Sequence, residues 1–478
     1  MFGCIRETYY MRIYMGVENF AKIESAEICI NQYTLLVGPN NSGKTFLMQL
    51  AEGINEKMET IIHENDLQFL KEEQDSNCNI YTLTQDSLDT LTERINLRLN
   101  RIKESIIIDT LGQNIPVDRI YLRIEVDPDE KYQIIQYFEG MEVGTKHPDN
   151  DFLKNIFKVP KDRQVIILKK MQENEKIIWA LIGNKNSSNY YIEEALLHLL
   201  TCKSLFMPAS RTGLMLLYRE FFAHKTDDSV SIQFIDGVAE KQQPRILGLT
   251  KPVYKFLRFL QTVTPPDLNS SKLIEYMKKD LHFYENNIIE GHISINEQGN
   301  MVYSVKDSKI NVPMYLASSM INEIAPLYLA ITSSRDRFRR LIIDEIESSL
   351  HPEKQMELVR FLNRLYNLKF EFIISTHSDT FVSKLNNLCL MAEYTKRTGD
   401  KAALKKLHLE ESDLVCADNL CVYEFVNKEN GKSVVREVPF NDKLGYQFDL
   451  FTDSALKLYN EATQIQEIIN NEHECCTE

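Results

Sequence analysis

The sequence predicts a two-lobed α/β fold in which buried parallel strands end in polar loops. Three short, mostly apolar runs carry this prediction, and each is followed at once by polar residues. Residues 33–37 precede a glycine-rich loop, residues 341–343 precede two carboxylates, and residues 371–374 precede a serine-threonine-histidine segment. Short apolar runs are typical of buried strands, and ligands of parallel sheets lie at the carboxyl ends of the strands. The three runs therefore predict one composite site.

Length and composition restrict the class of protein. The chain has 478 residues, so we expect two or three substructures rather than one simple core. No apolar run reaches the roughly 18 residues that a membrane span needs, and the first residues lack the apolar core of a signal peptide, so we expect a cytoplasmic protein. The nine cysteines show no zinc-binding spacing, which favours reduced thiols. The net charge of −14 disfavours a surface coated with nucleic acid, although it is compatible with a local basic groove.

The glycine-rich loop is residues 38–45, Gly-Pro-Asn-Asn-Ser-Gly-Lys-Thr, which we call the phosphate loop. It matches the pattern G-x-x-x-x-G-K-[ST] at every fixed position. In that pattern, backbone N–H groups and the following helix N-terminus bind phosphate, the lysine reaches the β- and γ-phosphates, and the last hydroxyl binds Mg²⁺. The alternative is a glycine turn before an ordinary helix. The expected nucleotide-binding residues are Gly38, Asn40, Asn41, Ser42, Gly43, Lys44 and Thr45.

Two carboxylates end the second apolar run. The sequence Leu-Ile-Ile at 341–343 predicts a buried strand that points Asp344 and Glu345 at a ligand. Asp344 would hold Mg²⁺ through water, so Thr45 and Asp344 are the expected metal residues. Glu345 would polarise the attacking water as general base. The alternative is a strand that simply enters an acidic loop.

The start of the chain resembles the ABC-type ATPases of the SMC, RecF and OLD group. Those proteins open with a strand, an x-N-F turn, a second strand and the same phosphate loop, here with Glu-Asn-Phe at 18–20, over about the first 50 residues. The stretch from Asp344 to Pro352, with the pattern DE-x-E-x-x-LHP, is similar to the OLD type. This resemblance implies an ABC-type P-loop ATPase that uses ATP and Mg²⁺. It also implies that His377 contacts the γ-phosphate and the attacking water, whereas the alternative is a loop histidine that caps a carbonyl.

Residues 316–323, which we call the signature segment, occupy the place of the ABC signature. By this resemblance, Ser318 and Ser319 would offer hydroxyl and N–H groups to a γ-phosphate held by another subunit. A homodimer or higher homo-oligomer with ATP between its subunits follows from that arrangement. Met320 stands where the family carries a glycine, and the alternative for these serines is a simple helix N-cap at Ser319.

The remaining chain predicts the organisation around these motifs. Residues 52–107 are expected to be largely helical, and their apolar spacing favours an amphipathic helix on the sheet over a short coiled coil. Four β-rich runs within residues 118–183 predict an antiparallel subdomain, which the resemblance implies to lie beside the nucleotide. The expected domains are an N-terminal lobe at 1–213, a helical insertion at 214–290 and a C-terminal lobe at 291–478.

Several basic residues lie close to these motifs. Arg211 follows the strand-like run that ends at Pro208, where the family carries its Q-loop, although no glutamine stands here. It would contact phosphate or a partner subunit, or else fix the loop from the surface. The arginines at 335, 337, 339 and 340 and a lysine-rich group at 396–406 are solvated by default, with contact to nucleic acid as the alternative.

Three functions are compatible with the sequence. No Asp-x-Asp pair follows His377, so we predict no nuclease domain of the OLD type. The resemblance to stand-alone phage-defence ATPases of the PtuA or AriA type implies an ATP-driven switch that controls a separately encoded effector, a nuclease or toxin. The first alternative is a DNA-repair ATPase of the RecF or SMC kind that clamps DNA. The second, which Met320 and the missing glutamine favour, is an ATP-bound scaffold with negligible hydrolysis.

Overall fold

A computed structural model describes most of the 478-residue chain. The described residues are 11–62, 72–75, 78–127, 131–143, 157–171, 176–184, 188–218, 248–263, 272–296, 300–308, 310–333, 338–448, 451 and 456–466. Within this part of the chain, no helix is both long enough and apolar enough to cross a membrane.

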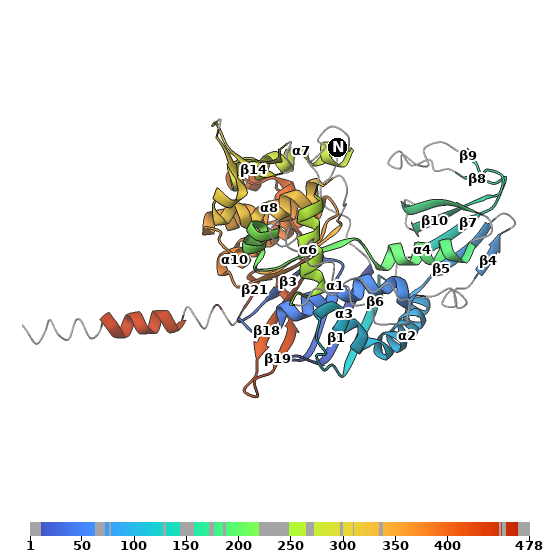
Figure 1. Cartoon of the computed structure of the whole chain (residues 1–478), viewed down its shortest axis with the longest axis horizontal. Coiled ribbons are helices and arrows are strands. Elements are labelled where there is room, and N and C mark those ends of the chain that lie inside the picture. Colours follow the sequence, from blue (N-terminus) through green and yellow to red (C-terminus); the bar gives the residue numbers. More distant parts are fainter. Residues whose placement is uncertain are drawn as a thin grey trace, which may run out of the picture.

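A sheet lies at the centre of the molecule (Figure 1). It has nine strands in the order β12-β16-β17-β3-β18-β19-β2-β1-β6. Its first five strands are parallel, and all of them except β18 lead into a predicted motif: β12 (Ser204–Met207), β16 (Arg340–Ile343), β17 (Glu371–Thr376), β3 (Tyr33–Val37) and β18 (Leu420–Asn427). The other four pair mainly antiparallel: β19 (Ser433–Glu437), β2 (Ile23–Cys29), β1 (Met11–Phe20) and β6 (Arg119–Val126). The predicted α/β class is confirmed.

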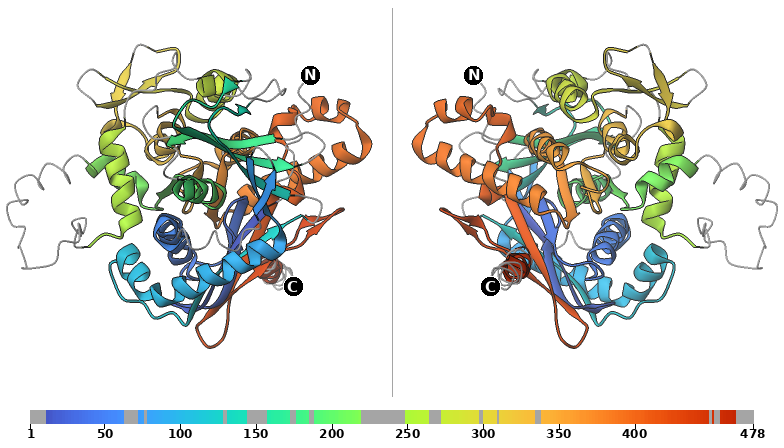
Figure 2. Two further views of the ribbon diagram at one scale, coloured as in Figure 1. Left: turned by 90° about the vertical axis from the view of Figure 1, so that its right-hand side faces the viewer. Right: turned by 90° about the vertical axis from the view of Figure 1, so that its left-hand side faces the viewer.

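Helices cover both faces of this sheet, because successive side chains of a buried strand point to opposite faces. In β3, Tyr33, Leu35 and Val37 enter one hydrophobic core, and Leu36 enters the other. The first core is closed chiefly by α6 (Lys251–Thr262), α7 (Lys272–Tyr284), α8 (Ser319–Thr332), α9 (Pro352–Asn367) and α10 (Asp379–Thr398). The second is closed by α1 (Lys44–Ile61), α2 (Gln85–Arg101), α3 (Lys103–Leu111) and α4 (Ser188–Leu200), of which α1 to α3 are blue and cyan in Figure 2.

Smaller elements complete the chain. A three-stranded sheet holds β13 (Gly291–Ile295), β14 (Met301–Val305) and β15 (Asn311–Pro313), and two short ladders pair β8 (Glu142–Val143) with β9 (Phe157–Lys158) and β20 (Phe440–Asn441) with β21 (Gly445–Tyr446). The short helical elements are η3 (Glu285–Ile289), η4 (Met314–Leu316), α11 (Ala402–Lys406), η5 (Glu411–Asp413) and η6 (Ala417–Asn419).

An antiparallel five-stranded sheet forms the predicted β subdomain. Its order is β11 (Lys176–Asn184), β10 (Arg163–Met171), β7 (Lys131–Tyr137), β5 (Cys78–Leu83) and β4 (Glu72–Asp75). Two expectations were wrong. Residues 119–126 pair with β1 in the central sheet, because an alternating pattern marks a half-buried strand without naming its partner. Residues 72–75 and 78–83, expected to be helical, form the strands β4 and β5, which pair antiparallel.

Helix α2 protects the β6 edge of the central sheet. Its buried face confirms the predicted amphipathic helix, with Leu88, Leu91, Ile95 and Leu99 in the core. Beside that face, Asn96 accepts a hydrogen bond from the N–H of Leu122 at 2.7 Å and donates one to the carbonyl of the same residue at 2.9 Å. Asn100 and Gln85 contact the edge of β6 in the same way. The side-chain amides thus take the place of a tenth strand and remove an exposed edge.

Asn96→Leu should destabilise the protein, because it leaves the N–H and carbonyl groups of Leu122 without their amide partner. We expect the free energy of unfolding to fall by roughly 1–3 kcal/mol, measured by urea denaturation. The neighbouring Leu97 is 65% exposed, so Leu97→Asn is a matched control with little expected effect. Equal stability of the two variants would contradict the role given to Asn96.

Candidate functional site

The phosphate loop connects the central strand β3 to α1. All five residues of β3 are buried, so the strand holds the start of the loop firmly. The loop needs its second glycine, because Gly43 has φ 102° and a Cβ placed on it would lie 2.8 Å from Cγ1 of Ile23. Helix α1 begins at the next residue, and its N-terminal N–H groups face the loop. The backbone therefore has the form that binds phosphate.

Lys44 lies inside the curve of the loop. Its ammonium group donates hydrogen bonds to the carbonyls of Gly38 and Pro39, each at 2.8 Å, and its residue is only 5% exposed. Burial lowers the pKa of Lys44 to about 8, although the carboxylates of Asp344 and Glu345 oppose that shift. The loop thus holds one cation at the position where phosphates would lie.

Oxygen ligands for a metal meet between α1 and β16. The hydroxyl of Thr45 donates to Oδ2 of Asp344 at 2.7 Å, and the hydroxyl of Ser375 donates to Oδ1 of the same carboxylate at 2.5 Å. A hydroxyl and a carboxylate are ligands that Mg²⁺ prefers, so these residues fit the expected ion. Ser375 was missed by sequence reasoning, although it stands in the Ser-Thr-His-Ser segment that drew attention to His377.

Glu345 and His377 face each other across the mouth of the site. Oε1 of Glu345 lies 3.6 Å from Nε2 of His377, and both side chains are partly exposed. Burial lowers the pKa of His377, and the nearby charge of Lys44 lowers it further. The neutral imidazole and the carboxylate are groups able to orient and polarise a water molecule. The Glu345 backbone has φ 48°, a left-handed conformation that is uncommon outside glycine.

Glu347 supports this pair and was not predicted as a site residue. Its Oε1 accepts a hydrogen bond from the backbone N–H of His377 at 2.5 Å, which links the segment after β16 to the segment after β17. The second oxygen, Oε2, is buried and forms no hydrogen bond within the described part of the chain. Its charge also contributes to the field at Lys44 and His377.

These residues surround one cavity of about 190 Å³. The structure brings together all the predicted site residues except Gly38 of the phosphate loop and the two serines of the signature segment. The lining residues are Lys22, Asn40, Asn41, Ser42, Gly43, Lys44, Thr45, Phe46, Asp344, Glu345 and His377. Lys22, another residue that sequence reasoning missed, donates to the carbonyl of Asn41 at 2.9 Å. No described residue of the five-stranded sheet lines this cavity, so that subdomain is not beside it.

Residues 11–382 match the family described as AAA ATPase domain. The chain belongs to the AAA ATPase domain family. No curated protein matches it. Solved structures with a detectable likeness include an SMC head domain from Thermotoga maritima, at 10% identity and TM-score 0.33, with 90% of this chain and 99% of that chain covered. Another is an SMC head bound to the C-winged helix domain of ScpA, at 12% identity and TM-score 0.35, with 90% and 98% covered.

The signature segment of this AAA ATPase domain lies outside the cavity. Ser318 is the N-cap of α8, because its hydroxyl accepts a hydrogen bond from the N–H of Ile321 at 3.3 Å. The cap therefore stands one residue before the expected position. Ser318 and Ser319 are both exposed, so their free surface is available to another molecule. Helix α8 continues through Pro326 to Thr332.

Two expectations about arginines need correction. Arg211 is neither at the phosphate cavity nor at the surface, because its side chain is only 2% exposed and is paired with Glu323 of α8. Arg340 is buried as well, and it pairs with Glu371 at 2.9 Å, while Arg339 pairs with the same carboxylate at 3.0 Å. Residues 335 and 337 of that basic run lie outside the described residues.

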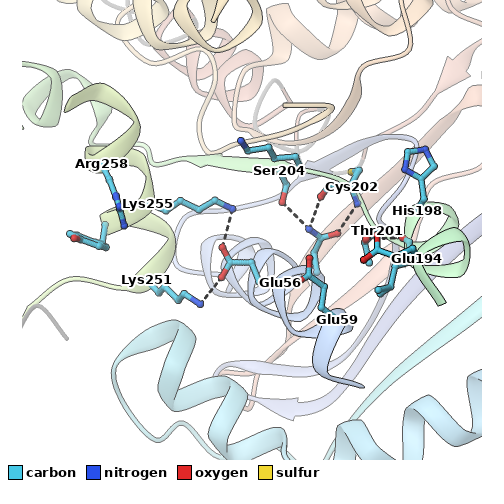
Figure 3. Close-up of a pocket in the computed structure, with 14 residues that line it drawn as sticks. Glu56, Glu59, Glu194, His198, Thr201, Cys202, Ser204, Lys251, Lys255 and Arg258 are labelled. Carbon is cyan, nitrogen blue, oxygen red and sulfur yellow. Dashed lines mark hydrogen bonds and ion pairs between the residues drawn. The ribbon is translucent and has the colours of Figure 1, made fainter. Parts of the chain in front are cut away.

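A larger cavity of about 720 Å³ lies beside the C-terminal half of α1, and it contains none of the predicted nucleotide residues (Figure 3). It is lined by α1, α4, α6 and residues 201–204. Lys251 and Lys255 of α6 extend toward Glu56 of α1, at 2.7 and 2.9 Å. Lys255 also pairs with Glu52, so two lysines face two carboxylates, and the contacts fix α6 against the helix that follows the phosphate loop.

The titration of Lys44 predicts a pH dependence of nucleotide affinity. Only the charged ammonium attracts phosphate, and its pKa of about 8 means that the charge is lost as pH rises through that value. We expect the affinity for ATP to fall roughly tenfold between about pH 7 and about pH 9, measured by calorimetry. Lys44→Arg stays charged, so any ATP binding that it retains should not vary with pH in this range. A constant wild-type affinity would contradict the placement of Lys44.

Proposed function

We propose that the protein is an ATP-binding and ATP-hydrolysing switch that dimerises through ATP and controls a separate effector. One observation carries the proposal: the phosphate loop, the Asp344–Glu345 pair and His377 meet around one cavity at the ends of adjacent strands. Lys44 would bind the phosphates, while Thr45 and Asp344 would hold Mg²⁺. Glu345 would accept a proton from the attacking water, with His377 orienting that water beside the γ-phosphate. Bound Mg²⁺ would neutralise charge that develops on the phosphate oxygens.

The size of the cavity supports a site completed by a second subunit. Its volume of about 190 Å³ lies below the roughly 300–1,000 Å³ of pockets that enclose a whole small ligand. Such a cavity suits the phosphate end of a nucleotide better than a whole nucleotide. Ser318 and Ser319 are exposed at the start of α8, and in a twofold dimer they would cover the nucleotide of the partner subunit.

The biological setting is inferred from motif resemblance. The stand-alone phage-defence ATPases that the sequence resembles act with a separately encoded nuclease or toxin, and we propose that role in the cytoplasm here. The scaffold alternative is favoured by Met320, whose partly buried side chain packs on the core where a glycine would leave room for phosphate. The DNA-clamp alternative receives less support, because Arg339 and Arg340 are held by Glu371 and Lys396 and Lys401 pair with acids.

Two substitutions separate binding from hydrolysis. Lys44→Ala removes the cation of the phosphate loop and should abolish ATP binding. Glu345→Gln keeps the shape of the side chain but removes the proton acceptor, so we expect binding to persist, hydrolysis to fall by roughly 10²-fold or more, and ATP dimers to accumulate. Phosphate release and light scattering measure these effects.

Glu353→Gln is the matched control for the second substitution, because Glu353 is an exposed carboxylate on α9 outside the cavity. Full turnover in Glu345→Gln would refute the general base. ATP-dependent dimers without phosphate release from the unchanged protein would favour the scaffold, and salt-sensitive, ATP-dependent binding to DNA would favour the clamp.

A further inference from the structure

Arg211 occupies an unusual position for a charged side chain. It begins a helical segment at residues 211–218, directly after the loop that follows β12. The guanidinium group is buried between that loop, the end of β16 and helix α8, and its side chain is only 2% exposed. A buried arginine is costly unless its charge is paired and its N–H groups are bonded. The identity of its partners therefore indicates what it holds together.

Arg211 makes four hydrogen bonds and one ion pair. On the side of α8, Nε donates to the carbonyl of Glu323 at 3.0 Å, and Nη2 pairs with the Glu323 carboxylate. On the side of the catalytic segment, Nη1 donates to the carbonyl of Asp344 at 2.6 Å and Nη2 to that of Glu345 at 3.0 Å. The fifth contact is to the carbonyl of Pro208 at 3.1 Å. One rigid planar group thus joins the helix to both catalytic carboxylate residues.

The contacts of Arg211 allow a movement of α8 to reach Glu345. Glu323 lies one helical turn after Ser319, so a shift of the exposed serines is carried to it by the helix. At the other end, Glu345 has the left-handed φ of 48°, and Arg211 bonds the carbonyl of that same residue. A peptide in an uncommon conformation persists only when its surroundings hold it. A shift of α8 therefore changes what holds Glu345 in place.

We propose that Arg211 is a positioning residue that couples the signature segment to the Asp344–Glu345 segment of the same subunit. The proposal rests on the proposed ATP dimer, in which Ser318 and Ser319 engage the nucleotide of the partner. When they do so, Arg211 conveys the position of α8 to Glu345, so that each subunit senses the nucleotide of the other. The two composite sites are thereby linked through one buried side chain in each subunit.

Arg211→Lys tests this role, because lysine keeps the charge but has only three N–H donors on a single nitrogen. The matched control is Arg364→Lys, since Arg364 is also only 2% exposed and pairs with a buried carboxylate, Asp413, at 2.7 Å outside the cavity. We expect both variants to melt at lower temperature. Only Arg211→Lys should lower the kcat of ATP hydrolysis, by roughly tenfold or more, with nucleotide affinity and KM within about twofold of the unchanged protein.

A second measurement does not depend on hydrolysis. In mixed dimers, a Lys44→Ala subunit cannot bind its own nucleotide, so any change in its segment 344–348 must come through its contact with the partner's nucleotide. With a non-hydrolysable ATP analogue, we expect slower amide exchange in that segment when the Lys44→Ala subunit has arginine at position 211. We expect no slowing when the same subunit has lysine there.

The outcomes are distinct. If the unchanged protein neither associates nor hydrolyses with ATP, the proposed function fails, and the coupling fails with it. If the unchanged protein is active and Arg211→Lys keeps its kcat and its exchange response, only the coupling is overturned. An equal loss of kcat in Arg364→Lys would assign the effect to general destabilisation and would likewise overturn the coupling.

Discussion

The site depends on three parallel strands that lie side by side. Strands β16, β17 and β3 are neighbours in the central sheet, and their registers bring Ile343 beside Ile374 and Thr376 beside Val37. All three strands are completely buried, because helices cover both faces. A slip of one residue would exchange the residues that face the two cores, so the register is strongly fixed. Residues as far apart in the chain as Thr45 and Asp344, which are 299 positions apart, therefore meet at one edge of the sheet.

Internal hydrogen bonds hold the polar groups at that edge. Lys44 bonds the carbonyls of its own loop, and Thr45, Asp344 and Ser375 form a continuous chain of hydroxyl and carboxylate groups. Phosphate and Mg²⁺ would take over these contacts with similar groups at similar positions. Binding would thus exchange hydrogen bonds instead of ordering a loose loop, which reduces the entropy that a ligand must overcome.

What the sequence predicted well were residues at the ends of strongly apolar runs. The loop at 38–45, the pair at 344–345 and His377 follow such runs directly, so a local pattern was enough to place them around one cavity. Ser375 was missed because the motif resemblance assigned a role only to the histidine of its segment. The burial of Arg211 depends on Glu323, which lies 112 positions away, and no local pattern records that pairing. Likewise, alternation at 119–126 marked a strand correctly but did not indicate that it joins the central sheet.

Two arginines in buried ion pairs fix the two ends of β16 against neighbouring helices. At the amino ends, Arg340 pairs with Glu371 and donates to Oδ1 of Asn55 at 3.0 Å, so β16 and β17 are tied to α1. At the carboxyl ends, Arg211 ties β16 to α8. Buried pairs of this kind add little net stability compared with apolar packing, but removing one partner is costly. Their value in this protein is geometric. Helix α1 follows the phosphate loop, α8 begins at the signature segment, and β16, which leads into Asp344 and Glu345, is the strand tied to both helices.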